Sequence, residues 1–68
     1  MPDLSLPTLA AKLKANMARM GWGVEATAAN CGIATQDVNC LVQGVMGFEL
    51  PWTQVFARVF NDPSWPTT

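Results

Sequence analysis

The segment from Ala28 to Gly44 constrains the fold of this chain more than any other part of the sequence. It carries small or apolar residues at six characteristic positions, which are Ala28, Gly32, Ile33, Val38, Leu41 and Gly44. A small residue allows two helices to approach closely, and glycine allows the backbone to turn sharply between them. The spacing therefore predicts two short helices, over residues 24–31 and 35–43, that cross at a tight turn.

Apolar residues at helical spacing predict two further helices, over residues 6–20 and 51–60. The apolar stripe of the first consists of Leu6, Leu9, Leu13, Met17 and Met20, and that of the last consists of Trp52, Val55, Phe56, Val59 and Phe60. Ser5 fits the N-cap of the first helix, and Thr35 or Ala34 fits that of the third, where a capping hydroxyl favours Thr35. Residues 61–68 contain two prolines and are expected to be extended. The predicted fold is all-α, with four to five short helices.

The composition favours a small globular unit with an excess of apolar side chains. The 68 residues leave room for one domain, 1–68, and 50% of them are hydrophobic while only 13% are charged. A disordered chain has low hydrophobicity and high charge, so disorder is excluded. A domain of this size buries only roughly 60% of the surface of its unfolded chain, and apolar patches left outside mark partner sites. We therefore expect a homodimer or a tight complex with another protein.

Aromatic residues and methionines near the C-terminal end are candidates for that interface. They are Met46, Phe48, Trp52, Phe56 and Phe60. Trp and Phe are favoured anchors at protein interfaces. The alternative is that these side chains form the core, and the sequence leaves both possibilities open.

The sequence gives no sign of a membrane or secretory route. Its longest apolar runs are far shorter than the ~20 residues of a membrane-spanning helix. The N-terminus lacks a basic region followed by an apolar core, which a secretory signal requires. We expect a cytoplasmic protein.

The residue types present give little support to catalysis or metal binding. The chain has no His and no Tyr, its acidic residues are scattered, and it contains no glycine-rich phosphate-binding loop. A nucleophile without a nearby base is not an active site, so we expect neither an enzyme nor a cofactor. Cys31 and Cys40 are too few for a disulfide scaffold and, without His, for a zinc site. We expect reduced thiols on or near the surface of residues 24–44.

The six residues named first form the pattern A-x3-G-I-x4-V-x2-L-x2-G, which resembles the helix-turn-helix of the lambda-repressor-like family of phage and bacterial regulators. The later residues Leu50, Pro51, Val55, Phe56 and Val59 resemble the helix that follows the motif in that family. The resemblance extends over residues 9–60. It implies DNA binding through residues 35–43, with Gln36 and Asn39 facing base edges and Thr35 facing phosphates.

The distribution of charge argues against this usual function. The formal net charge is −1, the pI is about 4.9, and no Lys or Arg lies between Met20 and Ala57. A well-bound regulator makes about six to ten phosphate contacts with basic side chains. Glu25 and Asp37 instead place carboxylates on the two helices of the motif. The basic residues of the first helix are Lys12, Lys14 and Arg19, which with Asn16 are expected to be solvated.

Two functions of different classes fit these observations. The first is a protein-binding module on a helix-turn-helix scaffold, of the size and acidity of a phage or prophage protein that inhibits or modulates a host regulator. The second is a dimeric DNA-binding regulator. In that case the DNA contacts would come from Thr35, Gln36, Asn39, Gln43, Lys12, Lys14 and Arg19. The charge balance favours the first function, and a purely structural subunit is a third, weaker hypothesis.

Overall fold

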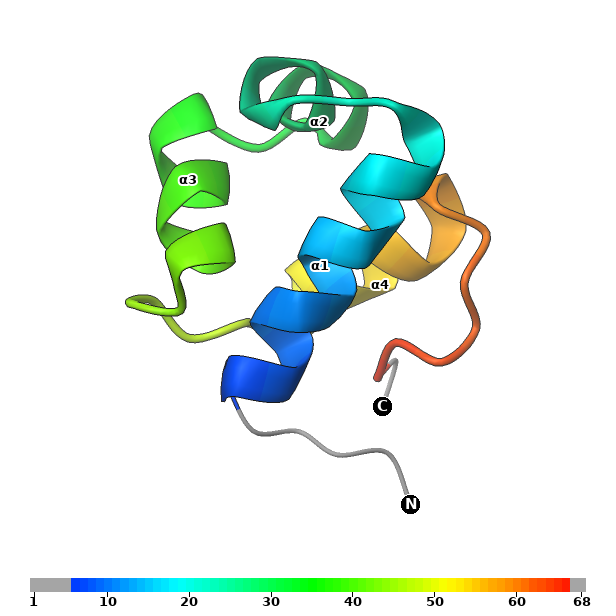
Figure 1. Cartoon of the computed structure of the whole chain (residues 1–68). Coiled ribbons are helices and arrows are strands. Elements are labelled where there is room, and N and C mark those ends of the chain that lie inside the picture. Colours follow the sequence, from blue (N-terminus) through cyan, green and yellow to red (C-terminus); the bar gives the residue numbers. More distant parts are fainter. Residues whose placement is uncertain (1–5, 67–68) are drawn as a thin grey trace.

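The computed structural model describes residues 6–66, with side chains from Thr8 onward. This region contains no strand and four α-helices, which are α1 (Leu6–Met20), α2 (Val24–Cys31), α3 (Thr35–Gln43) and α4 (Leu50–Val59) (Figure 1). The predicted all-α class is confirmed, and α1, α2 and α3 have the predicted bounds. The predicted cap at Ser5 lies outside the described residues.

Each helix of the described region is followed, within two residues of its last helical residue, by a residue in the left-handed conformation. These residues are Gly21, Gly32, Gly44 and Asn61, with φ angles between 53° and 74°. In each case the next residue donates its backbone N–H to the carbonyl five positions back, over 2.9–3.2 Å. Such bonds satisfy carbonyls that a helix end would otherwise leave unpaired. Three of the four helix ends are therefore set locally by a glycine.

The N-cap of α3 is not the favoured Thr35, and α4 lies one residue earlier in the chain than predicted. Ala34 occupies the N-cap position of α3 and makes no side-chain cap hydrogen bond, while Thr35 is the first helical residue. Helix α4 was expected over residues 51–60. It begins at Leu50 because the carbonyl of Glu49 already accepts the N–H of Thr53 over 3.1 Å. Pro51 is tolerated in this first turn, where a backbone N–H has no helical partner.

One apolar core joins the four helices and the C-terminal tail. The buried apolar side chains are Leu9, Ala10, Leu13 and Met17 of α1, Ala28 and Cys31 of α2, Val38 and Leu41 of α3, Phe56 of α4, Phe60 just after it, and Trp65. Helix α2 packs against α3 and α4, and α1 packs against α3. Burial of each large side chain contributes about 1.5–3 kcal/mol. Met20 departs from the predicted stripe, since 38% of it is exposed.

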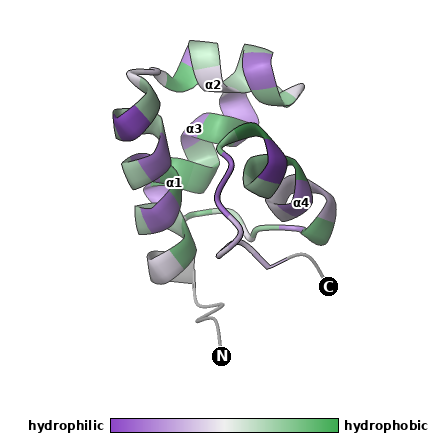
Figure 2. Cartoon of the chain, turned by 90° about the vertical axis from the view of Figure 1, so that its right-hand side faces the viewer, coloured by the Kyte–Doolittle hydropathy of each residue, from purple (hydrophilic) through white to green (hydrophobic). Residues whose placement is uncertain are grey.

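Residues 61–66 turn back onto the helices, and this corrects the expectation of an extended tail. The tail lies between α1 and α4 (Figure 2). One carboxylate oxygen of Asp62 accepts hydrogen bonds from the Ser64 N–H at 3.0 Å and the Ser64 hydroxyl at 2.6 Å, which closes a tight turn. That turn directs Trp65 inward, where it is 2% exposed. Burial of the indole outweighs the preference of the two prolines for an extended chain.

Candidate functional site

Helices α2 and α3 form a rigid unit around a three-residue turn. The left-handed Gly32 and the following Ile33 both donate their backbone N–H to the carbonyl of Ala28, the latter over 3.1 Å. On the inner side of α3, Val38 and Leu41 are fully buried. The opposite side of α3 is consequently held outward in a fixed orientation.

The outer face of α3 is polar and uncharged. We use this name for Thr35, Gln36, Asn39 and Gln43, which are all exposed. The Gln43 side-chain amide donates to the Asn39 carbonyl oxygen over 3.3 Å, so these two amides are partly ordered. All four residues predicted as DNA contacts of this helix therefore lie together on one surface.

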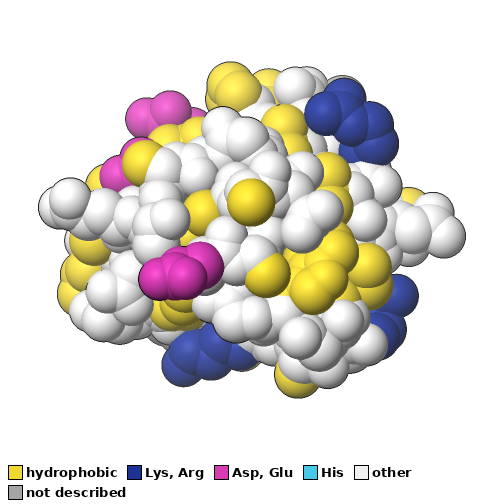
Figure 3. All heavy atoms as spheres, turned by 90° about the horizontal axis from the view of Figure 1, so that it is seen from above, with side chains coloured by type: hydrophobic (Ala, Val, Ile, Leu, Met, Phe, Trp, Pro, Cys, Tyr) yellow, Lys and Arg dark blue, Asp and Glu magenta, His cyan; other side chains and the backbone are white. Residues whose placement is uncertain are grey.

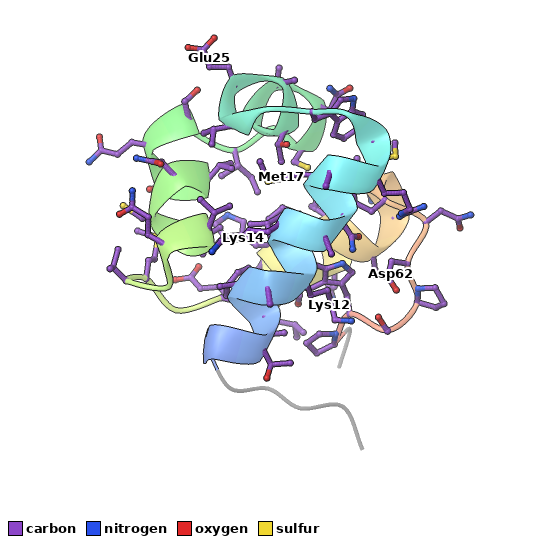
Figure 4. The ribbon with its side chains drawn as sticks, in the orientation of Figure 1. Lys12, Lys14, Met17, Glu25 and Asp62 are labelled. Carbon is purple, nitrogen blue, oxygen red and sulfur yellow. The ribbon has the colours of Figure 1, made fainter. Side chains whose placement is uncertain are left out.

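The surroundings of this face carry negative charge. Glu25 is exposed in the first turn of α2, and Asp37 is half-buried in the first turn of α3. Carboxylates at these places are each stabilised by the helix dipole, by about 0.3–1 kcal/mol. Figure 4 shows Glu25 pointing away from the body of the molecule. Seen from the side of α2, acidic side chains lie on this surface and basic ones at its margin (Figure 3).

The structure does not gather the basic residues of α1 beside α3. Lys12 donates to the Ser64 hydroxyl over 2.5 Å, and Arg19 donates to the Phe60 carbonyl over 2.5 Å. Both cations are thus engaged with the C-terminal tail and the end of α4. Lys14 is exposed, and Figure 4 shows it on a different side of α1 from Lys12. The predicted strip of three phosphate contacts is therefore divided between two sides of the helix.

The predicted aromatic interface is only partly at the surface. Phe56 and Phe60 are fully buried, which corrects their assignment to an interface: their rings stack on each other at 5.9 Å and fill the core. Trp52, Met46 and Phe48 are half-buried and pack against that core. Phe56 and Phe60 belong to the single core of the domain, which they fill together with Trp65 of the tail.

Three large apolar side chains are exposed in the described region. They are Met20 at the end of α1, Val45 after α3, and Leu50 at the start of α4, with Val45 the most open at 70%. A local signal exists for Val45, because it directly follows Gly44, where the helix stops and the chain leaves the core. Its exposure does not depend on the periodicity of any helix.

The two cysteines are free thiols, and only one lies near the surface. Cys31 is buried, and burial raises the pKa of its thiol, whereas Cys40 is half-buried. The expectation of two surface thiols is wrong for Cys31, which packs in the core under the α2–α3 turn. Among the described residues, no three His, Cys, Asp or Glu side chains lie close enough to hold a metal ion. No helix in this region has the length and apolarity needed to cross a membrane.

A polar cluster around Asn16 was missed at the level of sequence. Asn16 was expected to be solvated, but it is 6% exposed. Its amide nitrogen donates to Asp62 over 3.2 Å, and its amide oxygen accepts the indole N–H of Trp65 over 3.3 Å. The ammonium of Lys12 lies 5.9 Å from the centre of the Trp65 ring. The spacing of Asp62 and Ser64 is visible in the sequence and indicates a turn there. It does not identify Asn16, the partner of Asp62 on α1, which lies 46 positions earlier in the chain.

Comparison with protein-family models, with curated proteins and with solved structures finds no match to this chain.

Proposed function

We propose that this chain is a protein-binding module that uses the outer faces of α2 and α3, on a scaffold of the lambda-repressor-like helix-turn-helix type. The observation that carries the proposal is the polar outer face of α3, with a carboxylate in the first turn of each of α2 and α3 and no basic residue on either helix. A surface of this kind repels phosphate and attracts cationic groups. The fitting partner is a protein with a basic, nucleic-acid-facing surface, which the module would block as an inhibitor.

Energetic considerations support this choice over nucleic acid. Most of the affinity of a DNA-binding helix comes from cations that displace counterions at phosphates. Here Lys12 and Arg19 already donate to the tail and to the end of α4, and Arg58 lies in the last turn of α4. Lys14 is left as the one described cation of α1 without such a hydrogen bond. One or two contacts per chain would give weak, salt-sensitive attraction at most.

A dimeric DNA-binding regulator is the second candidate. The observation in its favour is the row of exposed amides formed by Gln36, Asn39 and Gln43 on one helix face. Amides of this type pair bidentately with adenine in the major groove. On this hypothesis, Gln36→Ala would abolish selective binding, and affinity would fall steeply as salt increases.

The deciding measurement is the binding of the folded protein to a fluorescent pool of random duplex DNA at about 50 mM salt, where electrostatic attraction is strong. We expect no binding at micromolar protein. Binding that selects a palindrome and is lost with Gln36→Ala would overturn the proposal in favour of the regulator.

A second measurement tests the proposed surface directly. The chain is immobilised and exposed to a cell lysate, and the proteins that it retains are compared with those retained by a Glu25→Gln/Asp37→Asn variant. This variant keeps the shape of both side chains and removes both charges. We expect a basic protein to be retained only by the unaltered chain, with nuclease treatment having no effect. Equal retention by both baits would show that the carboxylates do not direct binding.

A further inference from the structure

The C-terminal tail is held to the rest of the molecule by side chains. Beyond Asp62, the backbone hydrogen bond recorded for the described tail runs from the Trp65 N–H to the Asp62 carbonyl, 3.4 Å away and within the tail itself. Pro63 and Pro66 have no backbone N–H to offer. The tail is anchored instead by Trp65, and by Asp62 and Ser64 through their bonds to α1.

Trp65 occupies a site that is complementary to it in shape and chemistry. We call this the Trp65 site, formed by Asn16, Lys12, Phe48 and Phe56. The ring centres of Phe48 and Phe56 lie 5.8 Å and 5.0 Å from that of Trp65, and Asn16 accepts the indole N–H. Apolar rings and one buried acceptor suit an indole, which has an apolar body and a single N–H donor.

The direction of the tail depends on a single residue. Asn61 has φ 53° and is the one non-glycine residue of the described region with a positive φ. It permits the Asp62 N–H to reach the Ala57 carbonyl over 3.0 Å, which turns the chain back toward α1. Asparagine tolerates this conformation, but it adopts an extended one more readily. In the extended conformation the tail would point away from its own Trp65 site.

From these observations we propose that the tail is exchangeable: residues 62–66 of one chain dock in the Trp65 site of a second copy, and the result is a homodimer. The contacts made by Trp65 and Asp62 are the same in the closed monomer and in the exchanged dimer, so only the hinge and the entropy of association differ. Residues 62–65 span at most about 14 Å when extended. Exchange therefore requires the end of α4 in one chain to lie within about 14 Å of the Trp65 site of the other. This inference does not depend on the proposed function.

A matched pair of hinge variants tests the exchange. Valine strongly disfavours a positive φ and glycine accepts it, so Asn61→Val should open the hinge and Asn61→Gly should close it. We expect sedimentation equilibrium to give a dimerisation constant at least about tenfold larger for Asn61→Val than for Asn61→Gly. Adding Trp65→Ala to Asn61→Val should return the protein to a monomer. A monomeric Asn61→Val chain with native helix content, or a dimer that persists without Trp65, would overturn the proposal.

A second experiment applies if Asn61→Val does not fold. In the Trp65→Ala chain the Trp65 site lacks its indole. A synthetic peptide with the sequence of residues 60–66 takes the place of the tail of a second copy. We expect the peptide to bind this variant, and a peptide with alanine in place of its tryptophan to bind at least about tenfold more weakly. Absence of binding to a folded Trp65→Ala chain would show that the site does not accept a tail in trans.

Discussion

The hydroxyl of Thr27 is fully buried in α2 and finds no hydrogen-bond partner among the described residues. A buried polar atom without a partner costs about 1–3 kcal/mol. Valine has the same shape and a similar helix propensity. We therefore expect Thr27→Val to raise the free energy of unfolding by roughly 1 kcal/mol, which for a domain of this size increases Tm by about 4–8 °C. Thermal unfolding followed by circular dichroism measures the shift.

Thr53 offers the matched control, because it is equally buried but its hydroxyl donates to the Leu50 carbonyl over 2.9 Å. Thr53→Val should leave stability unchanged or lower it by about 1 kcal/mol. If both substitutions shift Tm in the same direction and by the same amount, hydrophobicity and not hydrogen bonding controls these positions.

Asp62 gives the tail a pH dependence. The hydrogen bond from the Ser64 hydroxyl is the largest cause and holds the pKa of the Asp62 carboxyl below its usual range. Burial, the second cause, opposes it, and the Ser64 N–H, Asn16 and Lys12 lower the pKa further. A lowered pKa in the folded state contributes stability at neutral pH, and this contribution is lost as pH falls through the folded-state pKa. Between neutral pH and about pH 3, Asp62→Asn should therefore lose less stability than the unaltered protein. Urea titrations at several pH values compare the two; parallel pH profiles would contradict the assignment.

At the scale of elements, the turn between α2 and α3 needs a glycine because of its backbone conformation. Gly32 has φ 69°, and a Cβ atom placed there would meet no atom within 4 Å. Gly32→Ala should therefore cost only the strain of the left-handed conformation, about 1–2 kcal/mol. Gly47 also has open space around it but no positive φ, so Gly47→Ala should be neutral or stabilising by up to about 1 kcal/mol. Equal effects in chemical denaturation would mean that the conformation of Gly32 is not what fixes the turn.

The difference between the helices and the tail explains how far the sequence could predict the molecule. Helices α1, α2 and α3 end where a glycine follows, which is a local signal, and their bounds were predicted to the residue. The outer face of α3 was also predictable, because its residues recur at helical spacing. The burial of Asn16 and Trp65 was not predictable, because each depends on a partner 49 positions away in the chain. Likewise, Phe56 and Phe60 could be assigned to the core only once the tail was seen to close it.

At the scale of the whole molecule, the tail buries apolar surface that the composition alone would assign to a partner interface. Half of the residues are hydrophobic, and this favoured a dimer held together by aromatic residues of the last helix. Instead, Trp65 from the same chain covers Phe56, and the large apolar side chains exposed in the described region are the non-aromatic Met20, Val45 and Leu50. The tail supplies within one chain the apolar cover that a partner would otherwise provide. A homodimer formed by exchange of the tail would keep this cover, with the indole supplied by the second copy.

The carboxylates Glu25 and Asp37 give the outer faces of α2 and α3 their negative charge. If this scaffold has the shape to follow a DNA groove and lacks only cations, Glu25→Lys/Asp37→Lys should create binding to random duplex DNA that the unaltered chain does not show. Each added phosphate contact should steepen the dependence of log affinity on log salt by about 0.9. Glu49→Lys is the charge-matched control for Glu25→Lys alone, since each raises the net charge by two; it places a cation at the N-cap of α4 and should give no comparable gain. Fluorescence anisotropy over a range of salt concentrations provides the slope. A folded double variant that still ignores DNA would mean that the shape of this surface, as well as its charge, is unsuited to nucleic acid.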